Sequence, residues 1–380
     1  MSEAAAGLYL HVPFCARVCP YCDFAVRTGD AARRARYVEH LLAEIELYAG
    51  YPLRFDTIYF GGGTPSSLAV EELARILETV RGRLACAERC WVFLEANPED
   101  ASREAVAAWR RIGVDTLSLG VQSLDPAGLA FLGRRHGVDD ARRAVEWARE
   151  AAFQTVSIDL IYGLPGQRPE DWRRELDRAL ALGPQHISCY QLTIHEGTRF
   201  GLLERRGRLT QLPSDEQGEL FRLAHRHLGA AGFAGYEASQ FAAGPEHRSR
   251  HNLKYWDHTP YLGLGPAAHS FHDERRWWNL RRTDPWQERI EHGERPVEGE
   301  ETLEARALVL ESLMTGLRTY AGVDLGRIRA RWGVDLLSAN GSLIDRLAAA
   351  GLVELDDGRL VPTLDGLAVA DGLAAQFDLP

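Results

Sequence analysis

Three cysteines lie close together near the start of the chain, in the segment HVPFCARVCPYCDF at residues 11–24. Cys15, Cys19 and Cys22 have the spacing C-x3-C-x2-C, and no fourth cysteine follows nearby. A structural zinc site normally has four ligands. His11 could be the fourth ligand of such a site, or it could be a histidine that is simply packed in a strand. Three thiolates on one tight loop can instead ligate three irons of a 4Fe-4S cubane, which leaves the fourth iron open to a small molecule.

Glycines and polar residues follow the next apolar runs of the chain. The segment FGGGTPS at residues 60–66 lacks side chains where a ligand could approach the backbone. Glu95 and Asn97 end the third run, Gln122 and Ser123 end the fourth, and Asp159 lies in the fifth. Each alone is more often a cap or turn residue. Because the carboxyl ends of parallel strands converge, these residues and the cysteine loop together predict one ligand site.

The elements that would position these residues alternate up to about residue 195. The expected strands are GLYLHV, DTIYF, WVFLEA, DTLSLGV, VSIDLIYG and HISCYQLTI. Amphipathic segments of helical period span residues 31–48, 70–84, 102–111, 139–151 and 169–182. Six successive βα units predict an α/β fold with a parallel sheet, either doubly wound or curled toward a barrel.

The rest of the chain changes in pattern, and we expect three regions, at residues 1–200, 201–300 and 301–380. The middle region is irregular, with aromatics and histidines in GYEASQF, HNLKYWDHTPYLGLGPAAHSF and RRWWNLRR. We expect it to be an α+β elaboration packed against the barrel. In the last region, helices are expected at 303–315, 325–332 and 338–350, before two strands joined by an Asp-Asp-Gly turn. This order predicts a winged-helix-like domain.

Composition argues against several classes of protein. The 380 residues carry a formal net charge of −10, and residues 301–380 hold seven arginines against twelve acidic residues, which disfavours nucleic acid as a partner. Lys254 is the only lysine, so arginine-rich runs carry little functional weight. Six cysteines are too few for a disulfide scaffold. Because no charged leader and no apolar run of about 18 residues is present, we expect a cytoplasmic protein.

Three further cysteines lie outside the opening cluster. Cys86 is expected to end a helix, Cys90 to precede an apolar strand and Cys189 to lie within a strand. Free cysteines are commonly buried as small apolar residues. We therefore expect all three to be buried, and we expect no second cluster.

The cysteine spacing, with an aromatic residue beside the last cysteine in CARVCPYC, resembles the signature of the radical S-adenosylmethionine (SAM) family. More narrowly, the order YLHVPFCARVCPYCDF, GGGTP, EANPE, GVQS, LGRRH and DLIYGLPGQ is similar to the oxygen-independent coproporphyrinogen III oxidase group. This resemblance implies a partial (βα)6 radical SAM barrel in which Cys15, Cys19 and Cys22 ligate a 4Fe-4S cluster. SAM would chelate the open iron through its amino and carboxylate groups. The positions that match SAM contacts are Tyr9, Tyr21, Gly62, Gly63, Thr64, Glu95, Gln122, Arg134 and Asp159.

Two departures from the oxidase pattern match a related branch, the radical SAM heme chaperones. Phe24 stands where the oxidases have a further cysteine, and only eight residues precede Tyr9 where the oxidases have a long segment. The similarity to this branch continues through HNLKYW, YLGLGPAAHSF and the C-terminal region. The resemblance implies a protein that binds heme and transfers it to an acceptor protein whose identity is open.

Heme requires an axial ligand for its iron and donors for its propionates. His251 is the first candidate ligand, with His258 and His269 behind it, and the alternative for each is a hydrogen-bonded structural histidine. The arginines around Trp277 and Trp278 could meet propionates or could lie solvated along the surface. They are Arg275, Arg276, Arg281 and Arg282.

Two other functions stay open. The cluster and SAM residues also fit the oxidase itself, which decarboxylates a porphyrinogen propionate by a 5′-deoxyadenosyl radical. A redox-sensing DNA regulator is the third option, and the acidic balance of residues 301–380 disfavours it. The acceptor could bring the protein to a membrane surface, and the hydrophobic pattern does not decide between a monomer and a homodimer.

Overall fold

The computed structural model describes residues 5–379, and a twelve-stranded sheet forms its centre. The strands lie in the order β12-β11-β10-β9-β1-β2-β3-β4-β5-β6-β8-β7, and β1 to β6 are parallel. These six are β1 (Ala6–Val12), β2 (Arg54–Gly62), β3 (Ala85–Ala96), β4 (Thr116–Gln122), β5 (Thr155–Tyr162) and β6 (His186–Gln191). Each contains most or all of one expected apolar run, because a strand buried on both faces needs a nearly continuous apolar sequence.

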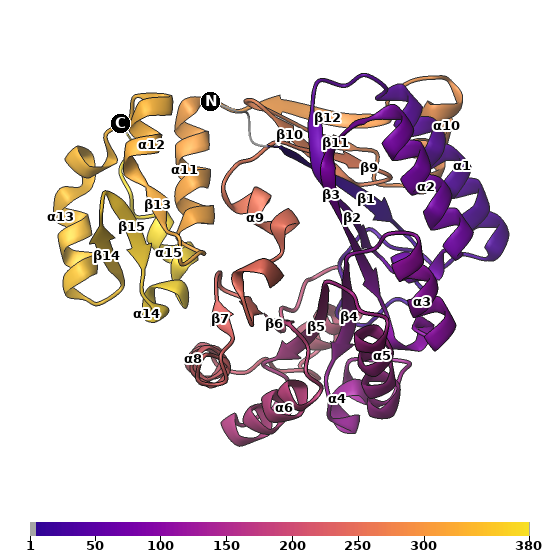
Figure 1. Cartoon of the computed structure of the whole chain (residues 1–380). Helices are drawn as coiled ribbons and strands as arrows, with labels where there is room; N and C mark the ends of the chain where they lie inside the picture. Colours follow the sequence, from indigo (N-terminus) through magenta and orange to yellow (C-terminus); the bar gives the residue numbers. More distant parts are fainter. Residues whose placement is uncertain (1–4, 380) are drawn as a thin grey trace.

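Six helices connect these strands and lie along one side of the curved sheet (Figure 1). They are α1 (Ala31–Leu47), α2 (Val70–Arg83), α3 (Arg103–Arg111), α4 (Pro126–Phe131), α5 (Val138–Glu150) and α6 (Pro169–Ala181), with short 3-10 turns at Pro65–Ser67 and Pro98–Asp100. Capping side chains mark where two of these helices begin: Asp30 and Ser102 accept hydrogen bonds from backbone N–H groups of α1 and α3. Because β1 to β6 follow one another without a reversal, the sheet is a partial barrel and not a doubly wound sheet.

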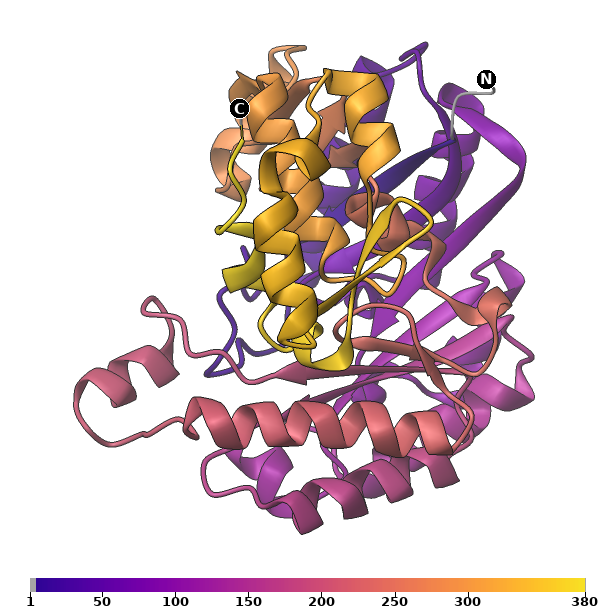
Figure 2. The same ribbon diagram turned by 90° about the vertical axis from the view of Figure 1, so that its left-hand side faces the viewer.

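The middle region widens this sheet at both edges. At one edge β8 (Gln240–Ala242) pairs antiparallel with β6, and β7 (Ala234–Gly235) pairs with β8. At the other edge β9 (Tyr261–Leu264) pairs in parallel with β1 and leads into the antiparallel strands β10 (His269–His272), β11 (Arg275–Asn279) and β12 (Val297–Thr302). The helices of this region are α7 (Arg199–Arg205), α8 (Ser214–Ala230), α9 (Arg250–Trp256) and α10 (Thr283–Glu291), and a 3-10 turn lies at Pro245–His247. The long helix α8 packs beside α6 (Figure 2).

The C-terminal region, at the left of Figure 1, has its own small sheet and its own core. Its elements are α11 (Ala305–Gly316), β13 (Val323–Asp324), α12 (Leu325–Trp332), α13 (Leu336–Ala349), β14 (Val353–Asp356), β15 (Arg359–Pro362), α14 (Leu364–Leu367) and α15 (Ala370–Ala374). The expected hairpin is present, and Asp357 and Gly358 have the positive φ values, +43° and +74°, that a two-residue hairpin turn requires. Helices followed by this hairpin confirm the winged-helix-like prediction, and with the partial barrel they confirm the α/β fold class.

Among residues 5–379, no helix combines the length and the apolar character that a bilayer crossing requires.

The cysteines outside the opening cluster differ from expectation at two positions. β3 begins at Ala85, so Cys86 lies in a strand and does not end a helix. Cys86 pairs with Phe55 and Trp91 pairs with Thr57. The four residues 87–90 of β3 therefore lie opposite the single residue Asp56 of β2 and form a bulge. Cys86 and Cys90 are only half-buried, and a hydrogen bond with Cys90 lowers the pKa of Cys86 to about 7. Cys189 is buried in β6, as expected.

A buried carboxylate ties α1 to the added strands. The Glu44 side chain accepts hydrogen bonds from Gly265 N (2.7 Å), Asn279 Nδ2 (2.6 Å) and Trp286 Nε1 (3.1 Å). These donors come from the segment after β9, from β11 and from α10, so a single side chain joins four parts of the fold. Burial raises the pKa of Glu44 to about 7, although the three hydrogen bonds act in the opposite direction.

Replacing Glu44 with Gln is expected to change how stability depends on pH. The folded pKa of about 7 lies above the ordinary value of 4.5, so the folded state holds the extra proton between these values. The free energy of unfolding of the wild type therefore falls as the pH rises through this window. Gln does not titrate. Between about pH 5 and about pH 7.5, the free energy of unfolding of the variant should therefore rise by about 2 kcal/mol relative to that of the wild type. Urea unfolding measures this, and an equal gap at both pH values would contradict it.

Candidate functional site

The cysteine loop leaves the end of β1 and is closed at its base. Arg27 N donates to Pro13 O at 2.7 Å, and Cys15 N donates to Arg27 O at 3.0 Å, so residues 13–27 form a loop whose ends meet. Within the loop, Cys22 N donates to Cys19 O at 3.2 Å. All three cysteines line one cavity of about 430 Å³, here called the cysteine cavity, together with residues from the carboxyl ends of the parallel strands.

The three thiols are the candidate metal ligands of the cavity. Among residues 5–379, no group of three or more His, Cys, Asp or Glu side chains is placed to hold one metal ion. In a cubane each thiolate binds a different iron, so the thiols have to surround a body and not converge on a point. Burial raises the pKa of Cys15 to about 11 and also raises the pKa of Cys22. A metal therefore has to displace protons from these thiols when it binds.

Backbone atoms at the end of β2 form one wall of the cavity. Gly63 N donates to Val12 O at 2.8 Å and Thr64 N donates to Phe14 O at 2.7 Å, which holds this wall against the cysteine loop. A Cβ atom on Gly63 would lie 2.7 Å from Phe14 O, and Gly62 has a φ of +109°. Both positions therefore need glycine, and the bare backbone allows a ligand to approach closely.

Two carboxylates lie deep in the cavity. Glu95 at the end of β3 accepts a hydrogen bond from Tyr59 OH at 2.7 Å, and burial raises the pKa of Glu95 to about 7. Asp159 in β5 accepts a hydrogen bond from Ser118 Oγ at 3.2 Å, and burial raises its pKa to about 6. Positively charged or hydroxyl groups of a ligand would stabilise the ionised form of both side chains.

Arg134 connects the cysteine loop to the strand ends. Its Nη1 donates to Cys19 Sγ at 3.5 Å, and its Nη2 donates to Asn97 Oδ1 at 2.5 Å and to Gly120 O at 3.0 Å. Its Nε is buried without a hydrogen-bond partner among the described residues. Gln122 beside it has a φ of +65°, a strained value for a residue with a side chain. The wall thus offers a guanidinium charge, held in place by three hydrogen bonds, to a carboxylate-bearing ligand.

Eleven of the thirteen predicted site residues line this cavity. They are Cys15, Cys19, Cys22, Tyr21, Gly62, Gly63, Thr64, Glu95, Gln122, Arg134 and Asp159. Tyr9 lies outside, with its hydroxyl 3.2 Å from His11 Nδ1. His11 Nε2 lies 3.1 Å from Ala25 O, so both of its ring nitrogens are engaged and it takes the packed alternative. Ser123 also lies outside, where its Oγ donates to Glu175 Oε1 at 2.9 Å.

His251, the remaining predicted residue, is enclosed between α9 and the barrel. The residue is only 1% exposed, its Nδ1 lies 2.9 Å from Thr57 Oγ1 and its Nε2 lies 2.8 Å from Tyr255 OH. Its ring stacks on Tyr59 with centroids 4.9 Å apart. Burial lowers the pKa of His251 to about 3, so the ring is neutral. Ligation of heme by His251 stays a prediction, and it would require the loss of one of these hydrogen bonds.

The two other candidate histidines have different surroundings. The Nδ1 atom of His258 lies 3.1 Å from Ser312 Oγ, and its Nε2 lies 3.4 Å from Glu311 Oε2. His269 begins β10, is exposed and stacks on Trp278. His258 therefore follows the hydrogen-bonded alternative, whereas His269 lies open on the sheet.

The four arginines proposed for propionates mostly have other contacts. Arg275 pairs with Glu300, and Arg276 pairs with Glu301 at 3.3 Å, both between β11 and β12. Arg281 donates to Asp23 O at 3.2 Å, and Arg282 stands at the N-cap position of α10 without a side-chain hydrogen bond to the helix. These contacts match the alternative in which the arginines lie along the surface.

Comparison with known proteins agrees with this geometry. Residues 9–179 match the radical SAM superfamily, and residues 303–369 match the HemN C-terminal domain. The heme chaperone HemW of Mycobacterium tuberculosis (strain CDC 1551 / Oshkosh) is 37% identical over 375 residues, which cover 97% of this chain and 93% of that protein. The chain belongs to the HemW family of radical SAM proteins. A second relative in this family, the heme chaperone HemW of Bacillus subtilis (strain 168), is 31% identical over 97% of this chain and 98% of its own length.

A solved structure shows the same fold. Coproporphyrinogen III oxidase (HemN) from Escherichia coli, a radical SAM enzyme, superposes with a TM-score of 0.83 over 98% of this chain and 90% of its own. Its sequence identity is 20%, so this likeness concerns the fold alone. Membership of the radical SAM superfamily brings a 4Fe-4S cluster and SAM as cofactors, and the cavity offers three thiols, a bare backbone wall and an arginine for them.

Part of the cavity wall was missed from the sequence. Tyr190, Thr193 and His195, at the end of β6 and in the loop after it, also line the cavity that contains the three cysteines. His195 Nδ1 lies 3.4 Å from Asp23 Oδ2 at the rim. The rule that parallel strands end at a common mouth predicts these positions as well, because HISCYQLTI is the sixth expected strand.

Proposed function

We propose that this protein is a heme chaperone that carries one 4Fe-4S cluster and SAM, binds heme and passes it to an acceptor protein. The observation that carries the proposal is the similarity to the heme chaperone HemW of Mycobacterium tuberculosis, which extends over 97% of the chain. The similarity therefore spans both the barrel with its cysteine loop and the C-terminal domain, and the proposed function uses both.

In this proposal the cysteine cavity holds the cofactors. Cys15, Cys19 and Cys22 would ligate three irons, and the backbone at Gly62 and Gly63 would receive the methionyl part of SAM. A bound cluster supplies single electrons to SAM. Of the remaining wall residues, Arg134 would hold the carboxylate of SAM, and the carboxylates of Glu95 and Asp159 would bind its ammonium and hydroxyl groups. Tyr21 would cover the cavity beside the last cysteine.

The oxidase is the alternative, and one residue argues against it. Phe24 is 65% exposed at the rim of the cavity, where the oxidase pattern has a further cysteine. A phenyl ring cannot take the place of that thiol in any reaction. Porphyrinogen decarboxylation is therefore the less favoured function.

Two assays on the cluster-reconstituted protein separate these functions. Hemin is titrated while the Soret band is followed, and an apo-globin is then added to receive the heme. We expect saturable binding and faster uptake by the globin than from an equal amount of hemin without the protein. Coproporphyrinogen III, SAM and reductant are supplied in the second assay, and we expect an unchanged porphyrin mass. Absence of saturable heme binding, or successive losses of carbon dioxide with matching 5′-deoxyadenosine, would overturn the proposal.

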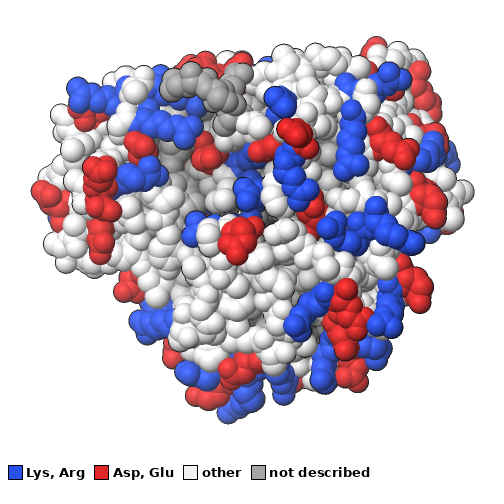
Figure 3. Space-filling view, viewed as in Figure 1, with Lys and Arg blue, Asp and Glu red and all other residues white. Residues whose placement is uncertain are grey.

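The partners and the location follow from the same proposal. We place the protein in the cytoplasm, where a reducing environment keeps its cysteines as thiols. On the face seen in Figure 3, basic and acidic side chains are interspersed, a pattern that does not favour nucleic acid. The acceptor is a protein, at a membrane surface or in solution, and the chaperone works as a monomer or a homodimer.

A further inference from the structure

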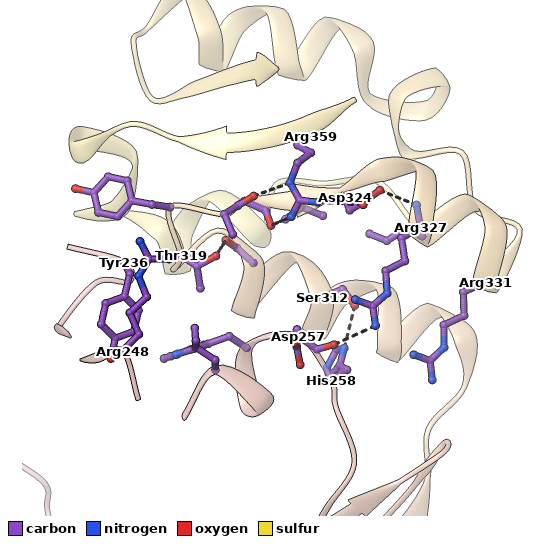
Figure 4. A pocket seen from close by; sticks show the side chains of 18 of the residues that line it. Tyr236, Arg248, Asp257, His258, Ser312, Thr319, Asp324, Arg327, Arg331 and Arg359 are labelled. Carbon is purple, nitrogen blue, oxygen red and sulfur yellow. Dashed lines mark hydrogen bonds and ion pairs between the residues drawn. The ribbon is translucent and has the colours of Figure 1, made fainter. Parts of the chain in front are cut away.

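A second cavity of about 430 Å³, here called the interdomain cavity, lies between α9 and the C-terminal domain, away from the cysteine loop. One wall comes from the end of β7 and from α9, and the other comes from α11, α12 and the segment between them. Figure 4 shows Tyr236 and Arg248 on the first side and Arg327 and Arg331 on the second. Its volume is within the range of sites for small molecules and cofactors.

Several contacts fix the two walls relative to one another. Ala238 N donates to Arg318 O at 2.9 Å, and Tyr320 N donates to Tyr236 O at 3.2 Å, so the backbones of the two parts are hydrogen-bonded. Arg327 also donates to the backbone oxygen of Asp257 at 3.4 Å. The cavity is therefore a formed feature of the fold.

The cavity concentrates positive charge in an acidic protein. Four arginines line it against two aspartates, whereas the chain as a whole has a formal net charge of −10. Arg359 is paired with Asp324 at 3.0 Å. Arg248, Arg327 and Arg331 make no ion pair with any carboxylate among residues 5–379. Three guanidinium groups around one cavity without carboxylate partners are a site for an anion with more than one acid group.

Two tryptophans in the cavity wall have unused donors. The indole Nε1 atoms of Trp256 and Trp332 are buried and have no hydrogen-bond partner among the described residues. Both residues line the cavity, but their N–H groups are closed off from solvent, so the rings and not the N–H groups are what an occupant would meet. The aromatic rings also offer apolar surface beside the charges, which suits a ligand with a flat apolar body.

The HNLKYW segment contributes to this cavity through a residue other than its histidine. His251 faces the barrel and bonds to Thr57 of β2, whereas Leu253 and Trp256 face the interdomain cavity. The short helix α9 thus presents one side to the barrel and the other side to the C-terminal domain. Trp256 is therefore a residue through which the HNLKYW segment would contact heme.

We infer that heme is held in this interdomain cavity, with its propionates on Arg248, Arg327 and Arg331 and its ring against Trp256 and Trp332. This inference rests on the proposed function and gives it a location. Of the described residues that line the cavity, His258 is the only histidine, and both of its ring nitrogens already have partners. The carboxylates and the ring therefore carry recognition, and the iron contributes little. Binding through the propionates and the ring leaves the iron open to a ligand from the acceptor.

Equilibrium titration of the reconstituted full-length protein tests the inference. Hemin, metal-free protoporphyrin IX and protoporphyrin dimethyl ester are the probes. We expect the first two to bind with similar Kd values, and the ester to bind at least about tenfold more weakly because its carboxylates are blocked. The variant Arg327→Gln/Arg331→Gln should raise the Kd for hemin about tenfold or more, and Trp256→Phe, which replaces the indole by a smaller ring, about threefold.

Arg329→Gln is the matched control, because Arg329 lies on the same helix, does not line the cavity and pairs with Asp335 at 3.3 Å. This variant should bind hemin like the wild type, and thermal unfolding verifies that all variants are folded. Wild-type affinity in the double variant would overturn the inference and leave the chaperone function standing. Binding of hemin without binding of protoporphyrin IX would also overturn it, because the iron would then dominate. Failure of the wild type to bind hemin would overturn the proposed function itself.

Discussion

A Cys19→Ala protein is expected to lose its iron–sulfur cluster. Cys19 is the middle residue of the C-x3-C-x2-C spacing, and its Sγ lies 3.5 Å from Arg134 Nη1 in the wall of the cavity. Two thiolates cannot replace three, because each binds a different iron and no further cysteine lines the described cavity. Iron and sulfide contents after anaerobic reconstitution, with the electron paramagnetic resonance spectrum of the reduced protein, measure the loss.

Cys189→Ala is the control for the cluster experiment. Cys189 is buried in β6 and does not line the cavity, so this variant should hold as much iron and sulfide as the wild type. The cluster assignment would be wrong if Cys19→Ala retained a full cluster, or if both variants lost it to the same extent. Heme binding by Cys19→Ala should persist, because the interdomain cavity contains none of the cluster cysteines.

A Gly63→Ala protein is expected to lose stability and most of its affinity for SAM. The new Cβ would lie 2.7 Å from Phe14 O and 2.9 Å from Val12 O, and both are backbone atoms that cannot rotate away. The end of β2 and the cysteine loop would have to move apart, which would strain the hydrogen bond from Gly63 N to Val12 O. We expect a loss of about 1–3 kcal/mol in the free energy of unfolding. A displaced wall should weaken SAM binding by about tenfold or more in equilibrium dialysis.

Gly82→Ala gives the matched control for this substitution. Gly82 lies in α2, and a Cβ atom there would have no heavy atom within 4 Å outside its own surroundings in the helix. Alanine is a better helix former than glycine, so this variant should be as stable as the wild type or gain up to about 1 kcal/mol. Unchanged SAM affinity in Gly63→Ala would mean that the backbone at this position does not contact the ligand.

The helix α9 gives the two cavities a structural connection. Through His251 it is bonded to β2, whose carboxyl end forms the glycine wall of the cysteine cavity. Through Trp256 it lines the cavity proposed for heme. A change in the barrel that moves β2 would therefore reach the interdomain cavity through a single short helix.

The sequence by itself determined the features that depend on neighbouring residues. Cys15, Cys19 and Cys22 share one loop because seven residues cannot separate them far, and apolar runs and side-chain caps located the strands and helices. The Asp-Asp-Gly turn likewise determined the hairpin β14–β15, since its residues accept positive φ values. Once six parallel strands were recognised, their common orientation also predicted that polar strand ends would meet at one cavity.

Only the tertiary structure decided the features that depend on contacts between distant segments. The pairing of β1 with β9, more than 200 residues away, shows no local signal and turns the middle region into an extension of the sheet. The bulge that brings Cys86 and Cys90 together depends on the register between β2 and β3. Whether His251 is open or enclosed depends on the packing of α9 against β2, and the interdomain cavity exists only because the C-terminal domain docks beside α9. Burial and hydrogen bonding at these places result from the whole fold, so spacing along the chain cannot predict them.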